Sequence, residues 1–173
     1  MGFYERIRAK LPALPGVVEG MRFGGPAFFY GRRFFCHCHV GSTQLSLEAF
    51  VFDQADKVTK SISGVIPHPE YSASGWVRLP IRNEGDLEHA LQLVELTYGY
   101  LRTTRRISLP RNGHNLMVLR RFRNERRDTR LRIKKSAKRI QVQIRVDSYD
   151  SLDEAEELVE QEVRRIRKLA YGT

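Results

Sequence analysis

Apolar and polar residues alternate with a period of two along several short segments of the chain. The clearest example is residues 139–146, where Ile, Val, Ile and Val alternate with Arg, Gln, Gln and Arg. Successive side chains of a β-strand point to opposite faces of the sheet, so this pattern predicts a strand with one apolar face and one polar face. The same criterion predicts further strands at residues 26–30, 33–40, 44–52, 75–81, 116–122 and 130–135.

Other segments show the spacing of helices, with apolar residues three or four positions apart. These segments are residues 3–11, 53–63, 86–101 and 152–170. Asp86 and Ser151 stand at the N-cap positions of the two longer helices, and Glu154 follows Ser151 at the spacing of a capping box. Strands and helices together predict an α+β protein.

Turn residues join the first three predicted strands into an antiparallel meander. Gly31-Arg32 suits a two-residue type II′ turn between residues 26–30 and 33–40, and Gly41-Ser42 precedes the third strand. The helix at residues 86–101 is expected to lie across this sheet, because its apolar residues form one stripe. The stripe consists of Leu87, Ala90, Leu91, Val94, Tyr98 and Leu101.

Three sequence blocks follow one another within the first 104 residues. They are Leu14-Pro15-Gly16-Val17-Val18-Glu19, Arg22-Phe23-Gly24-Gly25-Pro26-Ala27-Phe28-Phe29 and Ser74-Gly75-Trp76-Val77-Arg78-Leu79. Together with the helix that closes this part, the blocks resemble the MmcQ/YjbR family. The resemblance implies a two-layer, CyaY-like (frataxin-like) domain with helices on one face of a curved antiparallel sheet. It also implies a DNA-binding function.

The resemblance ends near Arg105, and the residues beyond it predict a small β-β-β-α module. The strands of this module are those at residues 116–122, 130–135 and 139–146, and its helix is that at residues 152–170. We therefore expect two domains, residues 1–104 and residues 105–173.

The net charge of the 173-residue chain, +10, is concentrated in the C-terminal part. Residues 1–104 carry a net charge of +1, whereas residues 105–173 carry 19 Lys and Arg against 10 Asp and Glu. Within residues 105–145, the only acidic residues are Glu125 and Asp128. A block of this kind raises the local positive potential and favours encounters with polyanions.

Pairing the apolar faces of residues 130–135 and 139–146 gathers their cations on the other face of the hairpin. Crowded like charges destabilise a hairpin unless an anion neutralises them. Arg and Gln also contact guanine and adenine edges, so the pattern predicts a nucleic-acid interface, with DNA favoured over RNA. The alternative is a solvated strand face. The predicted interface residues are Arg120, Arg121, Arg123, Arg126, Arg127, Arg130, Arg132, Lys134, Lys135, Lys138, Arg139, Gln141, Gln143 and Arg145.

Two other functions are compatible with the sequence. The basic face could instead meet an acidic partner, including the Glu-rich helix of a second copy in a homodimer. The acidic first turn of that helix is also expected to shield the basic sheet when no ligand is bound.

The run Cys36-His37-Cys38-His39 suggests a metal site, but a strand sends the two Cys to one face and the two His to the other. We therefore expect buried thiols beside Phe34 and Val40, and no metal or other cofactor. The alternative is a metal-binding, frataxin-like protein in which His37 and His39 form half of a site, with one or two further ligands from His68, His89 or His114.

Catalysis is not expected from the sequence. It contains no glycine-rich phosphate loop, no recognisable nucleophile and base, and no paired carboxylates. No segment approaches about 20 uninterrupted apolar residues, so we expect no membrane span. The two neighbouring Cys suit a reducing compartment, and we expect the chain in the cytoplasm.

Overall fold

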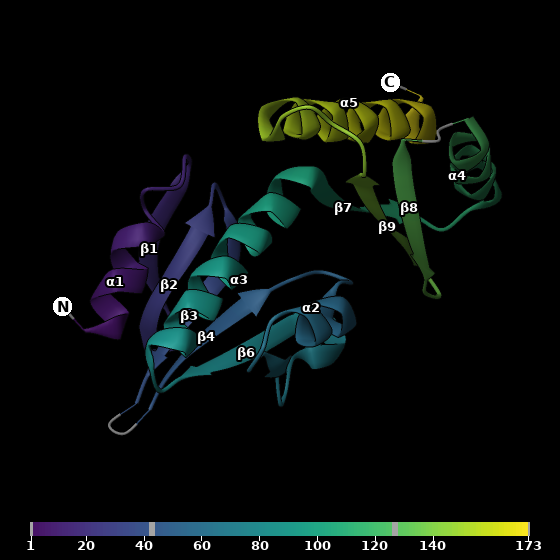
Figure 1. The fold of residues 1–173 in the computed structure, drawn as a ribbon. Coiled ribbons are helices and arrows are strands. Elements are labelled where there is room, and N and C mark those ends of the chain that lie inside the picture. Colours follow the sequence, from purple (N-terminus) through teal and green to yellow (C-terminus); the bar gives the residue numbers. More distant parts are fainter. Residues whose placement is uncertain (1, 42–43, 126–127, 173) are drawn as a thin grey trace. The chain divides into compact units, whose positions relative to one another are not determined.

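The strands of residues 1–100 form a curved, six-stranded antiparallel sheet in the spatial order β1-β2-β3-β4-β6-β5, counted over the described residues. The structure is a computed structural model that describes residues 2–41, 44–125 and 128–172 (Figure 1). Its strands are β1 (Val17–Arg22), β2 (Gly25–Tyr30), β3 (Arg33–Val40), β4 (Leu45–Phe50), β5 (Ile66–Pro67) and β6 (Trp76–Ile81). The helices of this part are α1 (Phe3–Lys10), α2 (Ala55–Ser61), the short 3-10 helix η1 (Ser72–Ser74) and α3 (Glu84–Thr103). The predicted α+β class and curved sheet are confirmed.

Two-residue turns close the first two hairpins of this sheet. Tyr30 pairs with Arg33 across Gly31-Arg32, and Gly31 has a φ of 58°, as the first position of a type II′ turn requires. The first hairpin was not predicted, because β1 reads as a loop in the sequence. Its turn is Phe23-Gly24, where both residues have positive φ, 53° and 77°. This is the geometry of a type I′ turn, and it is unusual for a bulky aromatic residue.

One face of the sheet is covered by α1 and α3, and the core lies between them (Figure 1). Leu87, Ala90 and Val94 of α3 are fully buried, as the predicted stripe requires. From the sheet, alternate residues of β4 and β6 enter the same core. These residues are Leu47, Ala49, Val77, Leu79 and Ile81. The residues between them face the opposite side of the sheet.

A β-bulge changes which residues of β3 face the core. Phe28 pairs with Cys36 and Phe29 with Phe34, so the register shifts by one residue. As a result Phe35 is fully buried, while Phe34 lies on the same face as His37 and lines a pocket there. The prediction that Phe34 shares the face of the two Cys is therefore wrong, because the alternation does not reveal the extra residue of a bulge.

Residues 101–173 form a second compact unit with its own sheet, in the order β7-β9-β8. Its elements are β7 (Thr104–Pro110), α4 (Gly113–Glu125), β8 (Thr129–Lys135), β9 (Arg139–Val146) and α5 (Leu152–Tyr171). Ile140, Val142 and Ile144 on β9 are fully buried and pack with apolar residues of α4 and α5. Both helices therefore cover one face of this sheet.

The order of elements in this unit corrects the predicted β-β-β-α module. Residues 116–122 are not a strand but the middle of α4, and the third strand is β7, which begins directly after α3. Leu119 and Phe122 are buried three positions apart, which is a helical spacing, and Asn112 accepts a hydrogen bond from the backbone N–H of Asn115 at 2.7 Å. That cap and that spacing favour a helix over a strand.

The boundary between the two compact units falls between Tyr100 and Leu101 along the chain. The predicted division into two functional domains at residues 104 and 105 stays a prediction. Over the part of the chain that the structure describes, no helix combines the length and apolar character needed to cross a bilayer.

Candidate functional site

The basic face of the second unit lies opposite the helix-covered face of the sheet β7-β9-β8. The strand register sets its rows: Arg132 lies opposite Gln143, and Gln143 lies opposite Arg106 on the other side. The next rows place Arg130 opposite Arg145, and Lys134 opposite Gln141. We use the name basic face for this surface, which comprises Arg106, Ser108, Arg130, Arg132, Lys134, Arg139, Gln141, Gln143 and Arg145.

The structure brings only some of the predicted interface residues together on this face. The seven that share it are Arg130, Arg132, Lys134, Arg139, Gln141, Gln143 and Arg145. Lys135 pairs with Ile140 and alternates to the other side, and Lys138 lies in the turn between β8 and β9. Arg106 and Ser108 were missed in the sequence because β7 was not recognised as a strand.

The arginines between residues 120 and 127 do not belong to the basic face. Arg120, Arg121 and Arg123 are exposed on α4, which packs against the opposite side of the sheet. A helix there separates them from the strand cations, contrary to the expectation that they extend the same surface. Arg126 and Arg127 lie outside the described residues.

Hydrogen bonds and ion pairs hold some of the side chains of the basic face in place. Arg106 donates from Nε to Oε1 of Gln143 at 2.9 Å, within one row of the sheet. Asp147, just after β9, pairs with Nε of Arg130 at 2.9 Å and with Nε of Arg145 at 3.3 Å. Lys134 and Arg139 have no ion-pair partner among the described residues. The carboxylate of Asp147 therefore offsets part of the positive charge gathered here.

The acidic first half of α5 does not shield the basic face. Glu156 pairs with Nε of Arg102 at 3.0 Å and with Arg105 at 2.8 Å, and Asp153 and Glu160 also pair with these two arginines. Arg105 alternates away from the basic face, since its neighbour Arg106 lies on it. The expected shielding is therefore wrong: α5 covers the other side of the sheet.

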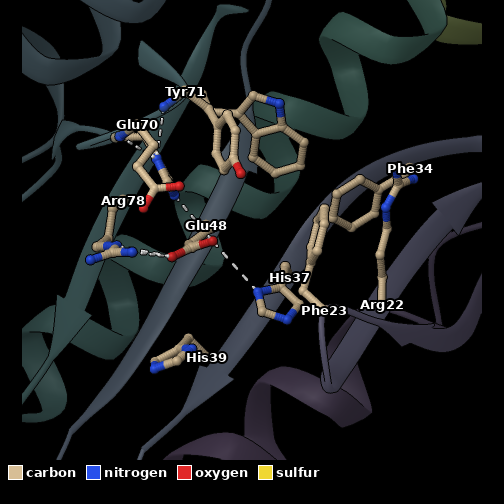
Figure 2. Close-up of a pocket in the computed structure, with 11 residues that line it drawn as sticks. Arg22, Phe23, Phe34, His37, His39, Glu48, Glu70, Tyr71 and Arg78 are labelled. Carbon is tan, nitrogen blue, oxygen red and sulfur yellow. Dashed lines mark hydrogen bonds and ion pairs between the residues drawn. The ribbon is translucent and has the colours of Figure 1, made fainter.

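A second site is a pocket on the open face of the first sheet (Figure 2). His37 on β3 lies opposite Glu48 on β4, and Glu48 lies opposite Arg78 on β6, so three strands place these side chains in one row. His68, from the segment after β5, completes a polar cluster around the Glu48 carboxylate. No sequence motif marks this cluster, because its members are spread over more than 40 positions.

Glu48 is held in its charged form by its neighbours. Oε1 accepts from Arg78 at 2.6 and 2.9 Å, and Oε2 lies 3.3 Å from Nε2 of His68 and 3.5 Å from Nδ1 of His37. Burial alone raises the pKa of Glu48, but the neighbouring His37, Arg78 and His68 outweigh burial and lower this pKa to about 2. The carboxylate is therefore an anion at neutral pH.

The two buried histidines differ in their hydrogen bonding. Nδ1 of His68 accepts from the backbone N–H groups of Glu70 and Tyr71, at 3.1 and 3.0 Å, so its proton is on Nε2 and points to Glu48. His37 is only 4% exposed, and neither of its ring nitrogens has a hydrogen-bond partner among the described residues. Buried polar atoms normally have partners, so His37 is the unusual member of the cluster.

Aromatic side chains form the other wall of the pocket, which has a volume of about 350 Å³. The ring centres of Phe34 and Trp76 lie 4.9 Å apart, and the two rings are tilted by 35° relative to each other. Phe23, at the tip of the first hairpin, contacts Phe34 and His37 edge-on. The guanidinium of Arg22 lies over Phe34 at 4.6 Å from the ring centre. The pocket therefore combines an aromatic wall with a charged floor.

The Cys and His residues of β3 face opposite sides, as predicted. Cys36 and Cys38 are fully buried free thiols in the core, and burial raises the pKa of both, that of Cys38 to about 12. His39 lies on the pocket side, with its ring 6.4 Å from that of His37. No group of three or more His, Cys, Asp or Glu in the described residues is placed to hold a metal ion.

Comparison with known proteins links the first unit to one family model. Residues 32–97 match the model described as Luciferase domain, and the matched range includes most of the pocket residues. No curated protein and no solved structure matches the chain. The match falls within the part that resembles the MmcQ/YjbR family, and that resemblance itself is not confirmed by a named relative.

Proposed function

We propose that the chain binds nucleic acid, DNA in preference to RNA, through the basic face of the second unit. The observation that carries the proposal is the one-sidedness of the sheet: helices cover one face, and the other presents arginines, lysines and glutamines in register. The match to the Luciferase domain model says nothing about this unit, since it ends at residue 97. We further expect a cytoplasmic protein whose basic face has a binding function and no catalytic one.

Charge supplies the affinity in this proposal. Each Lys or Arg that neutralises a phosphate releases a condensed counterion, so binding weakens steeply with salt. Arg130 has a side chain that is 71% exposed, and Lys134 and Arg139 are also exposed, so a phosphate backbone can reach them. Gln141 lies among these cations, and its amide is suited to contact base edges.

The test uses the full chain and a labelled DNA duplex at two or more salt concentrations. The face variant carries Arg130→Gln, Arg132→Gln, Arg139→Gln and Arg145→Gln. The matched control carries Arg120→Gln, Arg123→Gln, Arg164→Gln and Arg167→Gln, which removes the same charge from exposed positions on the two helices. We expect a log-log salt slope on the order of −4 for wild type, from about four to five neutralised phosphates.

The face variant is expected to bind at least about tenfold more weakly, whereas the control stays within about twofold of wild type. Circular dichroism checks that both variants keep their fold. Equal losses in the two variants would mean that net charge alone governs binding, and the basic face would not be the site. Duplex RNA and single strands, titrated in parallel, test the preference for DNA.

Sedimentation of the same samples separates this proposal from the alternative of an acidic protein partner. A homodimer that forms through the basic face would dissociate in the face variant and would not bind DNA. Such a result would replace the proposed nucleic-acid function by self-association.

A further inference from the structure

The pocket on the first sheet has no part in the proposed nucleic-acid binding, and its size suits a small molecule. Its volume of about 350 Å³ lies in the range of small-molecule sites, which are concave and mostly apolar with a few directed polar groups. The pocket has this composition: the tilted rings of Phe34 and Trp76 form an aromatic wall, and the cluster around Glu48 forms the floor. A flat aromatic ligand fits such a wall, because aromatic rings favour offset or tilted stacking.

The floor of the pocket lacks one hydrogen-bond partner. Glu48 is satisfied by Arg78 and His68, and His68 is satisfied by backbone N–H groups. Only His37 is left with both nitrogens unpaired among the described residues, with Nδ1 3.5 Å from the anionic Oε2 of Glu48. The anion favours the proton on Nδ1, so Nε2 carries a lone pair and can accept a hydrogen bond.

Nε2 of His37 is closed off from solvent in this structure. Gly25 packs against it, and a Cβ atom at position 25 would lie only 2.8 Å from Nε2, too close to fit beside the ring. Phe23 contacts the His37 ring edge-on from the other side and is 70% exposed. An exposed aromatic residue with a positive φ is a costly arrangement, and such strain is concentrated at functional sites. Phe23 is therefore placed to move aside and admit a ligand to His37.

Arg22 supplies a positive charge at the rim. Its guanidinium stacks on Phe34 and Phe23 but has no ion-pair partner in the described part of the chain. Arg78, the other arginine of the pocket, is already paired with Glu48. A ligand with a carboxylate can therefore be bound by Arg22 while its ring lies against the aromatic wall.

We propose that this pocket binds a flat aromatic molecule that carries a hydroxyl group, with the ring against Phe34 and Trp76 and the hydroxyl donating to Nε2 of His37. A carboxylate on the same molecule pairs with Arg22. This site is independent of the basic face, so its failure leaves the proposed nucleic-acid function untouched.

The test uses 6-hydroxy-2-naphthoate as probe and 2-naphthoate as the matched molecule without the hydroxyl. Trp76 is the only tryptophan of the chain and lines the pocket, so its fluorescence reports binding at this site in the intact chain. We expect a saturable change in Trp76 emission and a dissociation constant about tenfold lower for the hydroxylated probe, the effect of one buried hydrogen bond.

Variants of His37 and His39 test whether His37 causes the preference for the hydroxylated probe. In His37→Phe, which keeps an aromatic ring in the buried position, the difference between the two naphthoates is expected to disappear. His39→Phe is the control, because His39 is exposed on the same strand and face. The comparison of the two probes on wild-type protein needs no variant, so the proposal stays testable if His37→Phe does not fold.

Two outcomes would overturn the proposal. One is the absence of a saturable change in Trp76 emission with either naphthoate. The other is equal affinity of wild-type protein for both probes, which would show that the aromatic wall binds rings without a hydrogen bond to His37.

Discussion

Single residues show how burial and charge compete in this chain. Glu48 and Cys38 are both largely buried on neighbouring strands, yet their ionisation is shifted in opposite senses. Glu48 is surrounded by His37, His68 and Arg78, which favour its anion and lower its pKa to about 2. Cys38 faces an apolar core, where burial and then the charge of Glu19 raise its pKa to about 12. Neighbouring charge, and not burial alone, decides which side chain is ionised.

The low pKa of Glu48 makes stability depend on pH in acid. Its ordinary pKa is 4.5 and its value in the fold is about 2, so the ionised carboxylate stabilises the fold above pH 4.5. That contribution is lost as the pH falls toward 2. Glu48→Gln is expected to cost roughly 2 kcal/mol at pH 7 and to flatten the dependence between pH 4.5 and 2. Urea unfolding at several pH values measures both effects.

Glu88→Gln is the control for this experiment, since Glu88 is exposed on α3. It should change neither the stability at pH 7 nor the slope in acid. If Glu48→Gln behaves like this control, the cluster of His37, His68 and Arg78 does not stabilise the charged carboxylate.

The two thiols are expected to be unreactive in the folded protein. With a pKa of about 12, Cys38 is a thiolate in about one molecule in ten thousand at pH 8, and Cys36 is shifted in the same direction and fully buried. Ellman's reagent should therefore label neither thiol within minutes under native conditions and both thiols in urea. Rapid native labelling would contradict the burial of β3 in the core.

At the scale of elements, local sequence patterns predicted most of the helices and strands correctly but not all of them. The alternation of residues 139–146 gave β9 and its faces correctly, because one face is buried and the other open. Residues 116–122 were predicted as a strand, since three arginines near Phe122 obscure the helical spacing of Leu119 and Phe122. The bulge at Phe34 and the strand β1 were also missed.

The pocket could not be predicted, for a different reason. His37, Glu48 and Arg78 come from three strands, and only the pairing register places them in one row. Each alone is an ordinary polar residue of a half-buried strand. The basic face was predicted in part, because two of its strands are adjacent in sequence, whereas Arg106 comes from a strand that was not recognised.

The start of α5 is an element whose stability can be tested by one substitution. Oγ of Ser151 accepts from the backbone N–H of Glu154 at 3.2 Å, as the predicted N-cap requires. Ser151→Ala is expected to lower the free energy of unfolding by about 1 kcal/mol, because a backbone donor loses its partner. Denaturant unfolding measures this loss, and Ser148→Ala, in the exposed loop before the helix, is the control. Equal stability of both variants would show that the cap contributes nothing.

At the scale of the whole molecule, the distribution of charge is more informative than its total. The chain carries +10, but the acids of α5 pair with Arg102 and Arg105, whereas six Lys and Arg residues share the basic face. A surface of this kind interacts with polyanions through its local potential and not through net charge.

Heparin chromatography tests this distribution on intact protein. The face variant and the helix control described above have the same net charge, so a column that senses net charge alone elutes them together. We expect the face variant to elute at clearly lower salt than the control, because all four positive charges that it lacks come from one surface. Elution at the same salt would indicate that heparin does not distinguish the two surfaces.

The position of β8 has a consequence for solubility. It is an outer strand of its sheet, next to β9 only, and such strands can pair with strands of other molecules and start aggregation. Arg130, Arg132, Lys134 and Lys135 line it, and charge repulsion between copies keeps that edge from joining another. Neutralising these residues therefore removes a safeguard against self-assembly, and concentrated samples of such variants should form aggregates sooner than wild type.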